Sequence, residues 1–134
     1  MTWERFNPAS LGPPRGWTNG MLAPEGGRLL FVAGQDAADT EGEVTTDDFV
    51  EQFDLALAKT LAVVMEAGGV AGDIGRMTIF VTDLDAYRAA RGPIGDAYRA
   101  RMGRHFPAMA LVEVKGLVEG AAKVEIETTA VLPE

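Results

Sequence analysis

Few residues in this 134-residue chain could perform acid–base or nucleophilic chemistry. His105 is the only histidine and there is no cysteine, so a metal site built from several His or Cys ligands is excluded. Ser10 is the only serine, and nothing in the sequence brings it to His105 as part of a catalytic triad. The remaining candidates are carboxylates, and three of them, Glu113, Glu125 and Glu127, lie in alternating segments near the C-terminus.

Composition and motifs exclude several other classes of function. The acidic stretch 36–46 lacks the spacing of an EF-hand, and the chain has no P-loop and no GxGxxG. A formal net charge of −8 argues against nucleic acid as a partner, although five arginines between residues 88 and 104 leave room for a local basic spot. No apolar run reaches the roughly 18–20 residues that a membrane span needs, and the N-terminus lacks the features of a signal peptide. We therefore expect a cytoplasmic protein with no membrane partner.

Alternation of apolar and polar residues predicts strands with one buried face. The segments predicted in this way are residues 2–6, 76–81, 108–115 and 123–131, and the apolar run in residues 28–33 predicts a further strand. Residues 116–120, between the last two, are long enough to turn the chain back.

Two amphipathic helices are also predicted. The first is capped by Thr45 or Thr46 and ends near Gly68, and its apolar residues recur at three- and four-residue steps. That stripe consists of Phe49, Phe53, Leu57, Leu61 and Val64. The second follows residues 82–85 and contains Pro93, which indicates either a kinked helix or a short turn before a helix that starts near the proline.

These elements predict one domain over residues 1–134. An alternating sheet with two amphipathic helices favours an α+β sandwich in which both helices pack on one face of the sheet. The face of the sheet away from the helices then needs to be covered from solvent. We place Leu111 and Thr78 on it, and self-association is one way to bury it.

Trp17 follows the Pro- and Gly-rich loop of residues 7–16 and is a candidate for one wall of a ligand site. A second interpretation is that this side chain caps the edge of the core.

Seven short segments in order, spread over nearly the whole chain, form a pattern that is fairly specific to one fold. They are residues 33–35, 66–69, 72–74, 78–84, 106–108, 112–114 and 124–127. With this pattern the chain resembles the RidA/YjgF family of reactive-intermediate deaminases. The resemblance implies a chorismate-mutase-like α+β subunit that forms a homotrimer with a ligand cleft at each subunit interface. It also implies hydrolysis of small imines and enamines, such as 2-iminobutanoate, to 2-oxo acids and ammonia, without a metal or organic cofactor.

The resemblance assigns site positions as well. The family's glutamate that handles water corresponds to Glu125, its N-terminal tyrosine to Trp17, and its asparagine on the second helix falls near Arg91. The family's serine before Gly-Gln corresponds to Ala33, which is followed by Gly34.

The family's carboxylate-binding arginine corresponds to Met109. A hydrogen bond to a charged group contributes about 1.5–3 kcal/mol, so loss of a bidentate pair costs roughly 3–6 kcal/mol. Together with Trp17, Ala33 and Leu111, Met109 predicts a more apolar pocket and a ligand that is bulkier or lacks the small carboxylate. Two functions follow: a divergent deaminase that uses Glu125, or a binding trimer that has lost the chemistry. A ribonuclease is a poor third.

Overall fold

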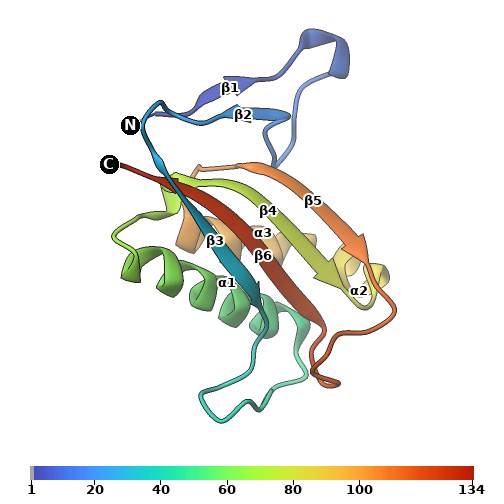
Figure 1. The fold of residues 1–134 in the computed structure, drawn as a ribbon. Helices are drawn as coiled ribbons and strands as arrows, with labels where there is room; N and C mark the ends of the chain where they lie inside the picture. The colour runs from blue at the N-terminus through green and yellow to red at the C-terminus, as the bar shows by residue number, and fades with distance from the viewer. Residues whose placement is uncertain (1) are drawn as a thin grey trace.

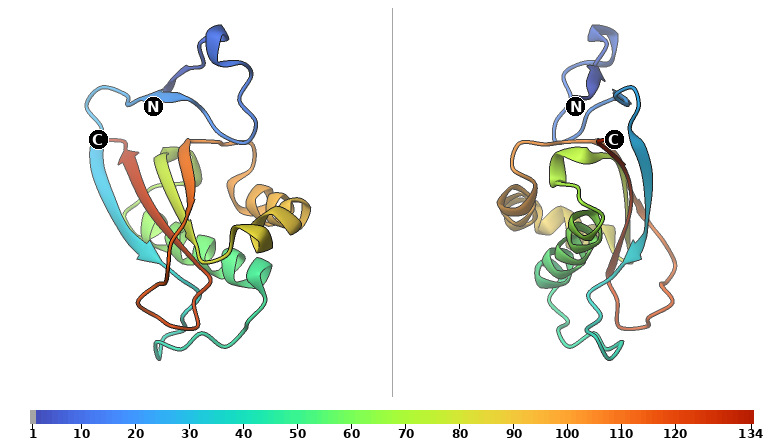
Figure 2. Two further views of the ribbon diagram at one scale, coloured as in Figure 1. Left: turned by 90° about the vertical axis from the view of Figure 1, so that its right-hand side faces the viewer. Right: turned by 60° about the vertical axis from the view of Figure 1, so that its left-hand side comes forward.

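The computed structural model describes residues 2–134 and contains a four-stranded sheet, a separate two-stranded hairpin and three α-helices (Figure 1). In chain order the elements are β1 Glu4–Phe6, η1 Ala9–Leu11, β2 Gly20–Leu22, β3 Arg28–Gln35, α1 Phe49–Glu66, η2 Ala71–Asp73, β4 Ile74–Val81, α2 Leu84–Ala89, α3 Arg91–Met102, β5 Ala108–Glu113 and β6 Val124–Leu132. The helices all lie on one side of the sheet (Figure 2), which confirms the predicted α+β arrangement. No helix in the described chain is long and apolar enough to cross a membrane.

Helix α1 forms where its apolar stripe predicts, and all five stripe residues are buried. Its N-cap is Asp48 and not Thr45 or Thr46, because the Asp48 carboxylate accepts the backbone N–H of Glu51 at 3.0 Å. The Thr46 hydroxyl instead donates to the Glu51 side chain. Beyond the helix, Gly68 adopts a φ of 92°, which favours glycine at this position.

The strand order is β3-β6-β4-β5, so the last two strands of the chain are not neighbours. Residues 116–120 do turn the chain back, but β6 enters between β3 and β4 and is antiparallel to both. Strand β5 is parallel to β4 and stands at the edge of the sheet. The helical segment between β4 and β5 supplies the crossover that a parallel pair requires.

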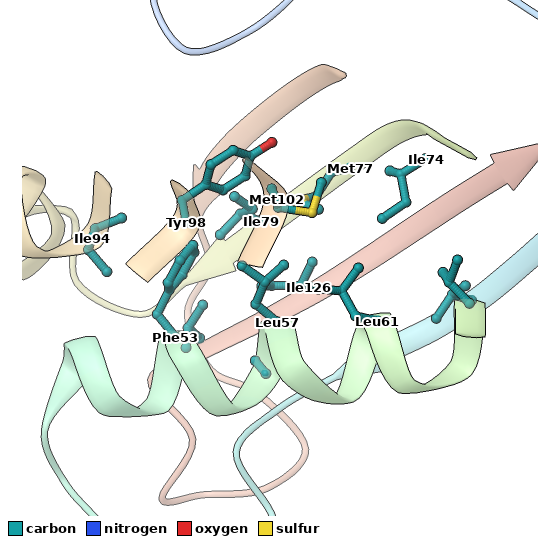
Figure 3. Close-up of a cluster of buried hydrophobic side chains, with 14 of the residues drawn as sticks. Phe53, Leu57, Leu61, Ile74, Met77, Ile79, Ile94, Tyr98, Met102 and Ile126 are labelled. Carbon is teal, nitrogen blue, oxygen red and sulfur yellow. The ribbon is translucent and has the colours of Figure 1, made fainter. Parts of the chain in front are cut away.

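Register determines which side chains face the helices. Met77, Ile79 and Val81 of β4 are buried under the helices, as Figure 3 shows for the first two. Leu111 lies opposite Ile79 in the ladder and therefore faces the helices, so our placement of Leu111 on the outer face is wrong, whereas Thr78 does lie on that face. Strand β5 carries apolar residues on both faces, and alternation alone did not identify the inner one.

The second helical region consists of two helices that meet at Ala90, with Pro93 in the first turn of α3. Ile94, Tyr98 and Met102 bury one face of α3. On its other side, Arg101 pairs with Asp54 of α1 through two hydrogen bonds of 2.6 and 3.0 Å. This pair lowers the pKa of the Asp54 carboxyl and connects the two helices at the surface.

Figure 1 shows the N-terminal hairpin of β1 and β2 beyond one end of the sheet, and side-chain hydrogen bonds attach it there. Trp3 donates its indole N–H to the carbonyl of Gly72 at 2.9 Å. Arg5 donates to the Thr18 hydroxyl at 3.1 Å and to Nδ1 of His105 at 3.0 Å. Because Arg5 is only a donor, the neutral His105 ring accepts at Nδ1 and donates from Nε2 to the carbonyl of Ile74 at 2.6 Å.

This bonding pattern predicts that His105 makes stability depend on pH. Burial lowers the pKa of His105 and Arg5 acts in the same direction, while the hydrogen bond to Ile74 opposes them. The unfolded chain therefore takes up a proton first as the pH falls below about 6.5, and stability present above that pH is lost as the pH falls toward the folded pKa. In urea unfolding, the stability advantage of the wild type over His105→Gln should shrink between pH 7.5 and 5.5. A difference that does not change with pH contradicts this account.

Candidate functional site

One cavity of about 620 Å³ lies beside strand β5, between the helical pair α2–α3 and the loop that precedes β2. Its volume is within the range of small-molecule sites. Trp17, Arg91, Met109 and Leu111, four of the residues predicted for a ligand site, all line this cavity.

The inner wall of the cavity is apolar and aromatic. Tyr98 and Phe106 stack with ring centroids 5.4 Å apart and an angle of 11° between the planes. Phe53 of α1 and Ile79 of β4 reach the wall from the core. A ligand here would replace water against carbon surface, which favours apolar groups.

Tyr98 is not available as an acid or a base. Its hydroxyl donates to the backbone carbonyl of His105 at 2.6 Å. Burial raises the pKa of Tyr98 well above its usual range, so the phenol stays neutral and serves as a fixed part of the wall.

Arginines form the rim of the cavity. Arg91, the first residue of α3, lies 5.7 Å from the centre of the Tyr87 ring, and both residues line the cavity. Arg15 contributes from the N-terminal loop, and Arg99 from α3 is paired with Asp96 at 2.9 Å. The cavity therefore has cationic groups at its rim although the side chain of Met109 in its wall is uncharged.

Two other predicted site residues, Glu125 and Gly34, meet on the other face of the sheet. Glu125 is opposite Phe80 in the ladder, whereas Met109 is opposite Met77 on the inner face. The Glu125 carboxylate lies against Gly34, where an added Cβ would be only 2.5 Å from Oε2. Glycine at position 34 thus gives the carboxylate room to lie across β3. A single copy of the chain does not bring Glu125 to the cavity.

The other candidates are separate from the cavity. Ala33 is exposed beside Gly34, where the β3–β6 register shifts. Glu113 accepts the backbone N–H of Leu84 at 3.0 Å, and Glu127 is exposed on the outer face opposite Thr78. Among residues 2–134 there is no group of three or more His, Cys, Asp or Glu side chains that could hold a metal ion.

Sequence reasoning missed several lining residues. Arg15 lies in an irregular Pro- and Gly-rich loop, and no periodic signal marks such a position. Tyr87 and Tyr98 lie in the second predicted helical region, where Arg91 was the residue assigned to a ligand site. Phe106 belongs to the recognised segment 106–108 and Arg99 to the second predicted helical region, but only the folded chain places them at the cavity.

Comparison with known proteins gives a consistent result. Residues 14–132 match the protein family described as Endoribonuclease L-PSP. The 2-iminobutanoate/2-iminopropanoate deaminase of Salmonella typhimurium strain LT2 is 31% identical over 124 residues, which cover 92% of this chain and 91% of that protein.

Two solved structures are similar to this one. A protein of unknown function of the conserved Rid family, YyfB from Yersinia pestis, has a TM-score of 0.85 at 27% identity and covers 98% of this chain and 100% of its own. TdcF from E. coli, solved with bound serine, has a TM-score of 0.66 at 30% identity and covers 88% of this chain and 95% of its own. With the family match, the curated relative and the shared fold taken together, the chain belongs to the RidA/YjgF family.

Proposed function

We propose that the protein is a divergent imine or enamine deaminase, that it acts as a homotrimer, and that its ligand differs from 2-iminobutanoate. The observation that carries this proposal is the division of the candidate residues between two faces of the sheet. Met109 and Arg91 belong to the cavity, whereas Glu125 and Gly34 lie on the outer face. A neighbouring copy is needed to bring Glu125 to the cavity.

The outer face supports association between copies. Leu29 and Phe31 of β3 and Val112 of β5 are large apolar residues on this face, and Phe31 is 75% exposed. Burying such a surface against another copy removes apolar area from water. The same contact would bring the outer face of one copy, with its glutamate, to the edge strand β5 of the next.

The reaction needs one acid and a bound imine. The carboxylate of Glu125 takes a proton from water while the water oxygen adds to the imine carbon, and returns that proton to the nitrogen to give a carbinolamine. It then carries the hydroxyl proton of the carbinolamine to the amine as the carbon–nitrogen bond breaks and the carbonyl forms, so the nitrogen leaves as ammonia. Water and the imine thus give a 2-oxo acid and ammonia. Met109 supplies no charge for the substrate carboxylate, which is the reason for proposing a different ligand.

The alternative function is a non-catalytic trimer that binds a small molecule in the same cavity. Met109 favours this alternative, because an apolar side chain stands where the family resemblance places a carboxylate-binding arginine. A ribonuclease, which the family description would suggest, is less favoured because the net charge is −8 and the single histidine is engaged by Arg5 and Ile74.

The first prediction concerns Met109. The purified wild type should hydrolyse 2-iminobutanoate slowly, and Met109→Arg should raise kcat/KM by on the order of 10²-fold, because the new cation can hold the substrate carboxylate. The imine is generated in the assay by a dehydratase, and 2-oxobutanoate is measured above spontaneous hydrolysis. Met109→Leu, which adds no charge, is the matched control. Robust wild-type activity would refute the proposed change of ligand.

Glu125 provides the second prediction. In the Met109→Arg background, Glu125→Gln should reduce kcat by about 10²-fold or more, since the acid–base group is lost. Glu127→Gln, two residues away on the same face, should leave kcat within about twofold. Equal losses from both substitutions would assign Glu125 a structural role.

Mixed subunits test whether two copies share a site. Wild-type chains contain Glu125 without the arginine, and chains with both Met109→Arg and Glu125→Gln contain the arginine without the acid. When the two are refolded together, activity should exceed the sum of the separate samples, because only a site between different chains has both groups. A mixture that is no more active than its components contradicts an inter-subunit site.

The assembly gives a further prediction. Light scattering should report about 43 kDa, three chains of 14.3 kDa. Phe31→Glu should produce monomers, because it places a charge in the proposed contact. Val118→Glu is the control, since Val118 is fully exposed in the loop before β6. A wild-type monomer would defeat the trimer, while circular dichroism verifies that both variants fold.

A further inference from the structure

We infer that the ligand of the cavity is an aromatic carboxylate, and that its anionic group is held by Arg91 and Arg15 at the rim. For a deaminase, the substrate class is then imines of aromatic amino acids. This inference deepens the proposed function and rests on it, because it names the ligand class of the same site.

The wall of the cavity is suited to an aromatic ring. The chain has ten aromatic residues, and five of them line this single cavity. The stacked pair Tyr98 and Phe106 offers a rigid surface, and Trp17 of the N-terminal loop also lines the cavity, with its indole N–H donating to Asn19 at 3.1 Å. Aromatic rings gain from stacked or edge-to-face contacts beyond simple burial.

The charge around the cavity selects an anion. The whole chain has 20 acidic and 12 basic residues, yet three arginines and no Asp or Glu are found among the residues that line this cavity. Arg99 is already paired with Asp96. In the described chain, Arg15 and Arg91 form no ion pair, so both can bind a carboxylate.

Arg91 is placed to act as the main anchor. It begins the 12-residue helix α3, whose N-terminal end carries a partial positive charge that adds to the guanidinium. The Tyr87 ring beneath it, 5.7 Å away, holds the guanidinium close to the cavity. A carboxylate at Arg91 would leave the attached ring to contact Met109 and the aromatic wall. Arg91 would thus supply the positive charge that Met109 does not provide.

Binding of stable probes tests this inference without requiring catalysis. We would titrate the 15N-labelled protein with 3-phenylpropanoate, 3-phenylpropanamide and butanoate and measure each Kd by NMR. The amide keeps the ring and removes the charge, whereas butanoate keeps the charge and removes the ring. The expected result is that 3-phenylpropanoate binds at least tenfold more tightly than either of the others.

Arginine variants identify the anchor. Arg91→Gln should weaken 3-phenylpropanoate by about tenfold, and Arg15→Gln by about threefold, because each removes one charge-assisted contact. Neither change should alter the Kd of the amide by more than about twofold, since the amide has no charge for either arginine to bind. Arg88→Gln is the matched control, because Arg88 is exposed on α2, pairs with Asp85 and does not line the cavity. Equal affinity for the three probes, or an equal loss from Arg88→Gln and Arg91→Gln, would overturn the inference.

Rates of imine hydrolysis distinguish the aromatic ligand class from the proposed deaminase reaction. The imine of phenylalanine, generated by an amino acid oxidase, should be hydrolysed faster than the imine of alanine, and the Arg91→Gln variant should hydrolyse both more slowly, because both imines carry the carboxylate. Selective binding of 3-phenylpropanoate without turnover of either imine would support the ligand class and refute the deaminase. Turnover of both imines at equal rates would support the deaminase and refute the aromatic ligand.

Discussion

The alternation of side chains along a strand is the constraint on which this molecule depends. Successive residues of β4, β5 and β6 point to opposite faces of the sheet, and the helices occupy only one of them. Met109 therefore faces the helices while Glu125 faces away from them. No rotamer of either side chain can change this assignment, because the backbone register sets it. A site that uses both residues therefore requires a contact between two copies of the chain.

Much of the fold could be predicted from the sequence, because it depends on local periodicity. Helix α1 repeats apolar residues at helical spacing, and β6 begins with alternating apolar and acidic residues, so both were identified at nearly their observed positions. Strand order is different, since it depends on contacts between distant segments that no local pattern contains. For this reason β6 could not be predicted to lie between β3 and β4. Leu111 was assigned to the wrong face because β5 is apolar on both sides.

The candidate site was only partly predictable for a related reason. Trp17, Arg91 and Met109 were identified through resemblance to aligned positions, and the structure brings these three side chains to one cavity. Arg15 had no counterpart in a recognised segment, and its role comes from the path of an irregular loop. Tyr98 belongs to the core and to the cavity at once, a double role that a hydrophobic stripe does not reveal.

The N-terminal hairpin can vary in sequence largely independently of the four-stranded sheet. Strands β1 and β2 pair only with each other, and the segment is fastened through Trp3, Arg5 and Thr18 to carbonyls and a ring at one end of the sheet. Trp17 belongs to this appendage, whereas the scaffold beneath it is built from residues 28–132. Substitutions in this N-terminal segment can therefore change the side of the cavity that Trp17 lines while the hydrophobic core stays intact. Over evolutionary time, this separation would let relatives acquire new ligand preferences without first losing their architecture.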